Sequence, residues 1–173
     1  MFNPTCLART VGAFPKLVGQ LIEVERTLAL QGLYICIPPD GGFRTATRQA
    51  QLWAEGRTVP GATVTNARDG AHSNHCYGLA FDVVPYTDET RSQINWKPNT
   101  PQFQRMVATI KAAGFDWGGN WTGDLGDFDH FQMRGLPSTP SPAMIADYAR
   151  SQVSGGSLSA IWAKAEAGAY KPL

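Results

Sequence analysis

One short stretch, DGAHSNHCYGLAFDVV, constrains the fold more than any other because a polar loop runs directly into a buried strand. In its second half Leu79, Phe81 and Val83 occupy alternate positions, which is the period of a strand with one face in the core. Asp82 lies inside this apolar run. A carboxylate is costly to bury unless it is paired or bound to a metal. The pattern therefore predicts a core strand that delivers a carboxylate to the edge of the core.

The loop before this strand offers a second candidate metal ligand. His75 lies seven residues before Asp82, and a glycine between them allows the loop to turn into the strand. A catalytic zinc site uses three nitrogen or oxygen ligands from the protein and a water. Among the three histidines of the chain, His130 is a candidate third ligand because an alternating segment follows it. The alternative for the bare spacing is a surface histidine and an edge-strand aspartate that both face water.

A zinc hydrolase also needs a carboxylate that takes a proton from water and passes it to the leaving amine. Asp127 lies three residues before His130 and is the candidate for this proton carrier. If the segment is already extended, Asp129 points to the opposite side.

Three further side chains have two readings each. Arg44 could orient a substrate carboxylate or stabilise an oxyanion, or it could be an exposed arginine just before a helix. Trp117 and Trp121 could form one wall of a groove, or they could pack in the core.

The composition is that of an ordinary globular protein. The chain has 173 residues, the length of one domain, with 43% hydrophobic residues and a net charge of +1. This balance gives no electrostatic case for binding nucleic acid or an anionic membrane, and no run approaches the roughly 18 apolar residues of a transmembrane helix. Three widely spaced cysteines form neither a disulfide framework nor a zinc knuckle. The N-terminus lacks the pattern of a signal peptide, so we expect synthesis in the cytoplasm.

Periodicity and punctuation predict a mixture of helices and short strands. The expected helices are 15–31, 45–56, 101–114, 143–153 and 157–169. The expected strands are 33–39, 78–86 and 130–133, with a glycine- and tryptophan-rich loop at 115–129. These elements indicate a single α+β domain over 1–173, with a small, mostly antiparallel sheet and surrounding helices. Its core spans about 15–135, and a C-terminal helical hairpin at 141–170 packs on that core.

Three motifs together resemble the family of D-alanyl-D-alanine carboxypeptidases and dipeptidases and phage L-alanyl-D-glutamate endopeptidases. The run SNHCYGLAFD matches every fixed position of the family pattern SxHxxGxAxD. Asp127 and His130 match its second pattern, a carboxylate three residues before a histidine. The stretch GFRTATRQAQLWAEGRTVPGATVTNA is similar to a third family segment. The resemblance covers roughly Gly41 to Gln132 and implies the fold of the hedgehog and D-Ala-D-Ala peptidases.

The resemblance implies a role for each candidate residue. It implies Zn²⁺ held by His75, Asp82 and His130, with Asp127 as general base and then acid. It implies that Arg44 polarises or anchors the substrate.

Four further residues are expected as substrate contacts: Ser73, Gln49, Trp117 and His72. Ser73 and Gln49 match family positions near the site, and His72 falls outside the pattern. Cys76 departs from the asparagine of many members, and we expect it to be a small packing residue off the metal.

The resemblance implies a peptidoglycan peptidase that cleaves the L-Ala–D-Glu bond of the stem peptide. An aspartate as acid/base and the WGGNW loop are more similar to the phage endopeptidases, so we expect a monomeric endolysin. It would reach the cell wall or periplasm from the host cytoplasm through a holin-type pore. The alternatives are a D-alanyl-D-alanine carboxypeptidase and a non-catalytic, zinc-stabilised wall-binding module.

Overall fold

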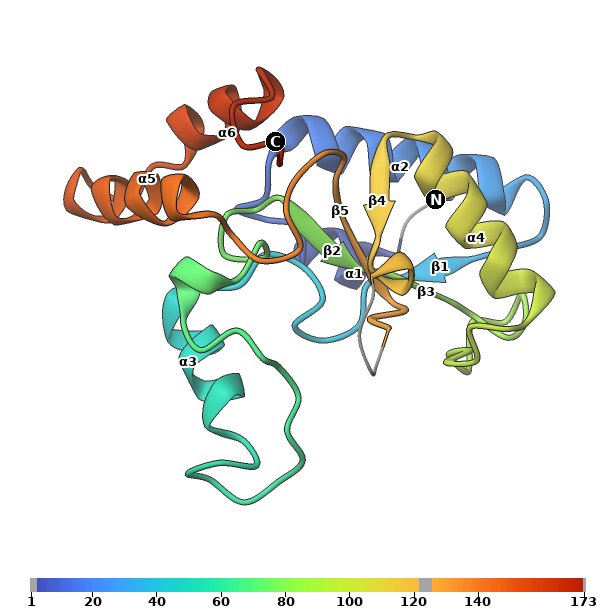
Figure 1. Ribbon diagram of the computed structural model, residues 1–173. Helices are drawn as coiled ribbons and strands as arrows, with labels where there is room; N and C mark the ends of the chain where they lie inside the picture. Colours follow the sequence, from blue (N-terminus) through green and yellow to red (C-terminus); the bar gives the residue numbers. More distant parts are fainter. Residues whose placement is uncertain (1–2, 122–125, 173) are drawn as a thin grey trace.

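The computed structural model describes residues 3–121 and 126–172, and short antiparallel strands lie in the middle of the molecule (Figure 1). The strands are β1 (Ile35–Cys36), β2 (Ala80–Asp82), β3 (Val84–Pro85), β4 (Phe115–Trp117) and β5 (His130–Met133). The helices are α1 (Pro4–Ala8), α2 (Pro15–Ala29), α3 (Ala46–Ala54), α4 (Pro101–Ala112), α5 (Pro142–Val153) and α6 (Ser159–Glu166), with 3-10 turns η1 (Gly70–His72) and η2 (Gly118–Asn120). This mixture confirms the predicted α+β class.

The strands form two small antiparallel sheets joined by one chain segment. β5 lies between β2 and β4, and β1 pairs with β3. β2 and β3 follow one another and are separated by Val83, whose N–H donates to the carbonyl of Asp129 at 2.7 Å. The single strand predicted over 78–86 is therefore split, because a loop carbonyl takes the hydrogen bond that a strand partner would otherwise make.

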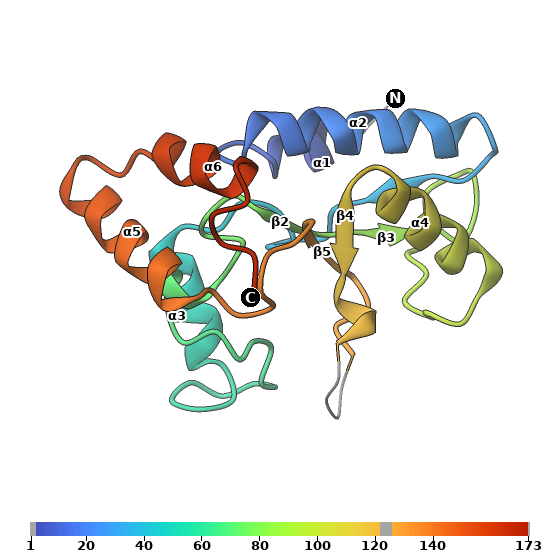
Figure 2. The same cartoon turned by 45° about the horizontal axis from the view of Figure 1, so that its top comes forward.

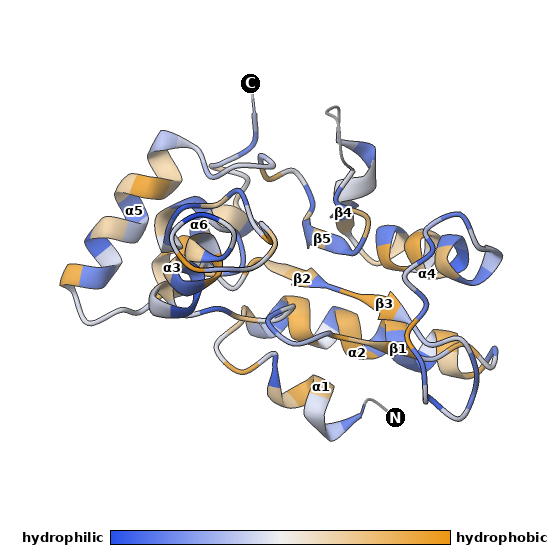
Figure 3. Ribbon diagram, turned by 90° about the horizontal axis from the view of Figure 1, so that it is seen from below, coloured by the Kyte–Doolittle hydropathy of each residue, from blue (hydrophilic) through white to orange (hydrophobic). Residues whose placement is uncertain are grey.

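The core lies between the strands and two long helices. In α2 the residues Leu17, Leu21, Val24 and Leu28 are all buried, as their helical spacing predicts. Figure 2 shows α2 running across the strands, and α4 contacts α2, β3 and β4. In Figure 3 the ribbons of β2 and β3 are coloured mostly as hydrophobic residues. No helix within the described ranges is long and apolar enough to cross a membrane.

Two elements are present that the sequence did not predict. β4 lies in the segment expected to be loop, and it is only three residues long. It exists because it pairs with β5, where Phe115 lies opposite Met133. The short helix α1 begins at Pro4 and is capped by the side chain of Asn3, which accepts from the N–H of Thr5. Neither segment is long enough to show a period.

The C-terminal helices pack on the part of the chain that carries His75. Trp162 Nε1 donates to the carbonyl of Tyr77 at 2.7 Å, and the Trp162 ring stacks on Phe14 with centroids 5.3 Å apart. A Cβ on Gly70 would stand 2.8 Å from the hydroxyl of Tyr148, so α5 approaches η1 closely. The two helices therefore support the turn that precedes β2.

Asp147 joins α5, α6 and the C-terminal segment. Its carboxylate accepts from Lys164 Nζ at 2.8 and 2.9 Å and from the Tyr170 hydroxyl at 2.6 Å. It also pairs with Arg150. Burial alone would raise the pKa of Asp147, but these bonds lower it to about 2.

Candidate metal centre

Strand register brings two of the predicted ligands together. β2 and β5 are antiparallel neighbours in which Asp82 lies opposite His130. Residues directly opposite each other have Cβ atoms about 4.5–5.5 Å apart and side chains on the same face of the sheet. His75 comes from the turn before β2, where Gly78 has a φ of 67° that glycine adopts without strain. The loop and the two strands therefore converge on one point.

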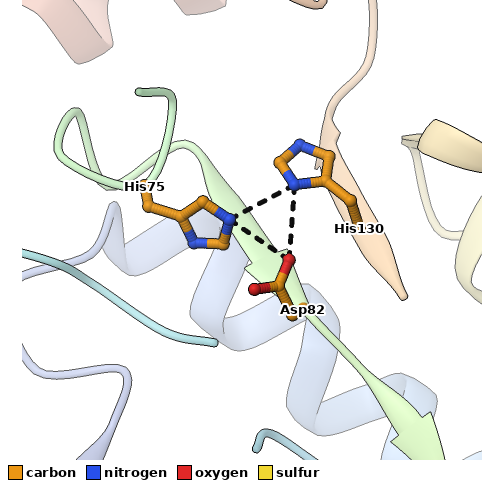
Figure 4. A group of neighbouring side chains, drawn as sticks. All are labelled: His75, Asp82 and His130. Atoms are coloured by element: carbon orange, nitrogen blue, oxygen red, sulfur yellow. Dashed lines mark hydrogen bonds and ion pairs between the residues drawn. The ribbon is translucent and has the colours of Figure 1, made fainter. Parts of the chain in front are cut away.

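At this point three ligand atoms face one another (Figure 4). His75 Nε2 lies 3.2 Å from Asp82 Oδ1 and 3.2 Å from His130 Nδ1. His130 Nδ1 lies 3.3 Å from Asp82 Oδ1. Around a tetrahedral ion with ligand distances of about 2.0–2.1 Å, ligand atoms stand about 3.3 Å apart. The dimensions of the cluster therefore fit a zinc ion.

The backbone sets the orientation of the His75 ring. His75 Nδ1 lies 3.0 Å from the carbonyl oxygen of Gly42. Because a carbonyl only accepts hydrogen bonds, Nδ1 must carry the proton. The neutral ring then turns the lone pair of Nε2 toward the cluster, which is the form that binds a metal.

A side-chain amide sets the orientation of the His130 ring. His130 Nε2 lies 3.3 Å from Gln132 Oε1, so Nε2 donates and Nδ1 is left as the atom that faces Asp82. Sequence reasoning did not single out Gln132. The alternation of the strand could have indicated it, because a residue two positions after His130 lies on the same face of β5 as the ligand.

The chemistry of this donor set requires a cation. A carboxylate oxygen and two imidazole lone pairs cannot satisfy one another, since all three accept hydrogen bonds when the rings are neutral. Either a proton or a metal ion must lie between them. The three atoms therefore form a site that could hold a divalent metal, and nitrogen and carboxylate ligands suit zinc.

Arg44 occupies the other oxygen of Asp82. Arg44 Nη2 donates to Asp82 Oδ2 at 2.7 Å, which leaves Oδ1 for the cluster. Burial alone would raise the pKa of Asp82, but the two histidines and Arg44 hold this pKa well below its usual range. Burial lowers the pKa of His75. The cluster thus offers an ionised carboxylate and a neutral imidazole at neutral pH, as metal ligands must be.

His130 differs from His75 in its protonation. Burial would lower the pKa of His130, but its hydrogen bond to Asp82 and the charge of that carboxylate raise it. The Asp82 carboxylate therefore favours the protonated form of this ring. Because a metal ion binds the unprotonated ring nitrogen, metal binding at this cluster is coupled to pH.

The cluster lies on the floor of a cleft of about 920 Å³. One wall is the segment 63–68, which carries Arg68. The opposite wall includes Trp121, whose ring centroid lies 5.0 Å from that of His130. The site is therefore accessible to a substrate of peptide size, which suits an enzyme better than a buried structural metal.

Two aspartates of one short segment reach the cleft. Asp127 is half exposed, and its Oδ2 lies 4.0 Å from His130 Nδ1. Asp129 also lines the cleft. The expectation that it points to the opposite side held only for an extended segment, and that condition is not met. The chain bends over the two residues before β5 instead of being extended there. Burial raises the pKa of Asp129 to about 7, and the charges of Asp82 and Asp127 add to the rise.

The predicted substrate contacts separate into two groups. Ser73 and His72 line the cleft. His72 Nδ1 lies 2.6 Å from Asp69 Oδ1, so a carboxylate holds this ring at the cleft wall. Gln49 is fully buried, and its Oε1 accepts from Arg44 Nη1 at 3.3 Å. It is therefore placed to hold Arg44 rather than to touch a substrate.

The two tryptophans also differ. Trp117 Nε1 donates to the carbonyl of Phe128 at 2.6 Å, and Trp117 does not line the cleft as far as the described residues define it. Trp121 does. The Cys76 thiol is directed to the carbonyl of Thr45 at 3.8 Å, away from the cluster.

Known proteins share this segment and this fold. Residues 66–133 match the model of a peptidase family described as D-alanyl-D-alanine carboxypeptidase. The peptidoglycan L-alanyl-D-glutamate endopeptidase CwlK of Bacillus subtilis (strain 168) is 34% identical over 99 residues, which cover 53% of this chain and 57% of CwlK. The chain thus matches little more than half the length of this curated relative. The crystal structure of the Serratia marcescens L-Ala D-Glu endopeptidase ChiX aligns with a TM-score of 0.55 and 21% identity, over 76% of this chain and 88% of ChiX. At this identity the likeness shows a shared fold.

Proposed function

We propose that this chain, whose residues 66–133 match the model of a peptidase family described as D-alanyl-D-alanine carboxypeptidase, is a zinc peptidase that cleaves the L-alanyl–D-glutamate bond of the peptidoglycan stem peptide. The observation that carries the proposal is the cluster of three facing acceptor atoms, 3.2–3.3 Å apart, on the floor of an open cleft with a carboxylate beside it. The choice of the cleaved bond follows the names of CwlK and ChiX, which are both L-alanyl-D-glutamate endopeptidases.

In this proposal His75, Asp82 and His130 hold the zinc. When bound, zinc supplies a Lewis acid for the scissile carbonyl and for water. Asp127 accepts the proton of the attacking water and returns it to the leaving amine, because it reaches the cluster from the cleft side and stays exposed to substrate. Arg44 keeps Asp82 ionised and oriented, and it also lines the cleft where a substrate oxygen can contact it.

Digestion of purified peptidoglycan tests which bond of the stem peptide the protein cleaves. Endopeptidase action leaves new N-terminal D-glutamate, which labelling of free amines and mass spectrometry of the fragments detect. Release of free D-alanine without new D-glutamate termini would instead support the alternative, a D-alanyl-D-alanine carboxypeptidase. The description of the matching family favours that alternative, and Arg68 at the cleft wall could receive a terminal carboxylate.

A non-catalytic wall-binding module is the second alternative. Such a module needs the metal for folding but has no use for an exposed carboxylate beside it. Asp127 is 51% exposed and lies at the cluster, which favours catalysis. Binding to intact peptidoglycan with no release of fragments, at saturating zinc, would support the module.

The setting that we propose is lysis by a bacteriophage, with the enzyme acting as a monomer. The protein would be made in the host cytoplasm and would reach the wall through a holin-type pore. Expression in the cytoplasm should leave cells intact until a pore-forming protein is co-expressed. Lysis without any pore would contradict this setting and would leave the peptidase activity untouched.

A further inference from the structure

We propose that Gln132 and Asn74 are positioning residues that determine which ring nitrogen of His130 faces the metal. The inference rests on the proposed function, because it concerns how the same metal site is held. Both side chains are buried, and Gln132 is completely so. Gln132 lies in β5, whereas Asn74 lies next to His75 in the turn before β2. The pair therefore links the two segments that carry the histidines.

The far end of Gln132 fixes the orientation of its amide. Gln132 Nε2 donates to the carbonyl of Leu136 at 2.9 Å and to that of Pro137 at 3.2 Å. Two carbonyls at that end require the NH₂ group there. The amide oxygen must then face His130, whose Nε2 lies 3.3 Å away. An acceptor at this place selects the ring form with the proton on Nε2.

Asn74 holds this oxygen from the other side. Asn74 Nδ2 donates to Gln132 Oε1 at 2.8 Å and to the carbonyl of Pro137 at 3.1 Å. The same arrangement leaves Asn74 Oδ1 buried, and it has no hydrogen-bond partner within the described part of the chain. A buried acceptor without a donor is costly, and a leucine of similar size would avoid the cost. An asparagine at position 74 is explained if the site requires its NH₂ group as a donor to Gln132.

The consequence concerns the lone pair of His130. With the proton on Nε2, Nδ1 presents its lone pair to the position shared with Asp82 Oδ1 and His75 Nε2. Without the acceptor the neutral ring can carry its proton on Nδ1, and that form cannot bind a metal through Nδ1. The two neutral forms have the same charge, so the loss of affinity does not depend on pH. Removing a hydrogen-bond partner of a ligating histidine typically weakens metal binding about 10–100-fold.

The substitution Gln132→Met removes the acceptor and nearly keeps the size of the side chain. We expect the dissociation constant for Zn²⁺, measured by competition with a chromophoric chelator, to rise about 10–100-fold. The ratio to the wild-type protein should be the same at pH 7 and at pH 9, where a purely protonation-based effect would vanish. Gln132→Glu restores an acceptor toward His130 and should recover most of the affinity. The visible spectrum of the Co²⁺-loaded protein should change in the Met variant and return in the Glu variant.

Asn95 provides a matched control for Asn74. Asn95 is also buried, and its Nδ2 donates to Thr100 Oγ1 at 2.8 Å, but it does not line the cleft. Asn74→Leu should weaken Zn²⁺ binding several-fold, whereas Asn95→Leu should lower thermal stability and leave Zn²⁺ affinity unchanged. This pair decides the question if Gln132→Met does not fold.

Two results would overturn the inference. One is a folded Gln132→Met protein that binds Zn²⁺ as tightly as the wild type. The other is an equal Zn²⁺ affinity of the Asn74→Leu and Asn95→Leu proteins. Because metal affinity is the readout, a protein that depends on Gln132 for zinc but leaves peptidoglycan intact would refute the proposed function and not this inference.

Discussion

Replacing Asp127 by asparagine separates proton transfer from metal binding. The amide keeps the size of the side chain and cannot act as a base near neutral pH. Asp127 is not one of the three atoms of the cluster, and its nearest oxygen stands 4.0 Å from His130 Nδ1. We expect Asp127→Asn to bind zinc and fold normally but to lose most of its hydrolytic rate.

The magnitudes of the two effects differ enough to be measured apart. Two unit charges 4 Å apart in water interact by about 1 kcal/mol, so a solvent-screened carboxylate beside a divalent ion contributes on the order of 2 kcal/mol. That corresponds to a loss of zinc affinity of about 30-fold. The loss of a general acid/base costs about 10²–10⁴ in rate, or about 3–5 kcal/mol of barrier. At saturating zinc, a loss of hydrolytic rate therefore reflects the loss of proton transfer and not a loss of bound metal.

The assay counts new N-terminal D-glutamate on purified peptidoglycan, with Asp129→Asn as the matched control. Asp129 lines the same cleft two residues away, so both variants lose one carboxylate from the same segment. We expect Asp129→Asn to retain far more activity than Asp127→Asn. The reasoning is refuted if Asp127→Asn works at nearly the wild-type rate, or if Asp129→Asn is the more severe loss.

Three further predictions concern the metal and the C-terminal helices. His130→Ala removes one of three ligands, and elemental analysis after dialysis should find far less than one zinc per chain; a stoichiometric metal content would exclude the assigned ligand set. Because Asp82 raises the pKa of His130, zinc titrations should show affinity falling about tenfold per pH unit below that pKa, and an affinity independent of pH would contradict competition between proton and metal at this ring. Asp147 has a pKa of about 2 against an ordinary 3.8, so its contribution to stability is present above pH 4 and is lost as the pH falls toward 2. Asp147→Asn should therefore lower the free energy of unfolding by about 2 kcal/mol at pH 7. At pH 3 the substitution should lower the free energy of unfolding by roughly half as much. Urea unfolding at both pH values can check this, and an equal loss at the two values would assign the effect to packing.

The parts of the fold that the sequence predicted are those with a long, regular signal. The helix at α2 was expected from Pro15 and begins there, because proline and the apolar spacing coincide. The helix expected over 45–56 is α3, and Thr45 caps it by accepting from the N–H of Arg48. Residues 66–133, which carry most of the predicted resemblance, match the model of a peptidase family described as D-alanyl-D-alanine carboxypeptidase. Elements such as β4, which exist through pairing with another strand, have no signal of their own.

The sequence predicted which residues form the candidate site but not the contacts between them and their neighbours. The motif named His75, Asp82 and His130, and the structure brings these three together. It gave no sign that Arg44 is committed to Asp82, because that contact joins positions 38 residues apart. The same holds for the bend that turns Asp129 into the cleft, since periodicity describes extended strands and not the irregular residues before them.

The three ligands depend on different parts of the fold. Asp82 and His130 are held by the register of β2 against β5, which the sheet itself determines. His75 is outside the sheet, and its ring is oriented by the carbonyl of Gly42 and its turn by the bond from Trp162 to the carbonyl of Tyr77. The C-terminal helices lie far from the motif in sequence, yet they contribute to the placement of the one ligand that no strand constrains. Preorganisation of this metal site is therefore a property of the whole domain, because the motif supplies the donor atoms and α6 helps to fix the loop that carries one of them.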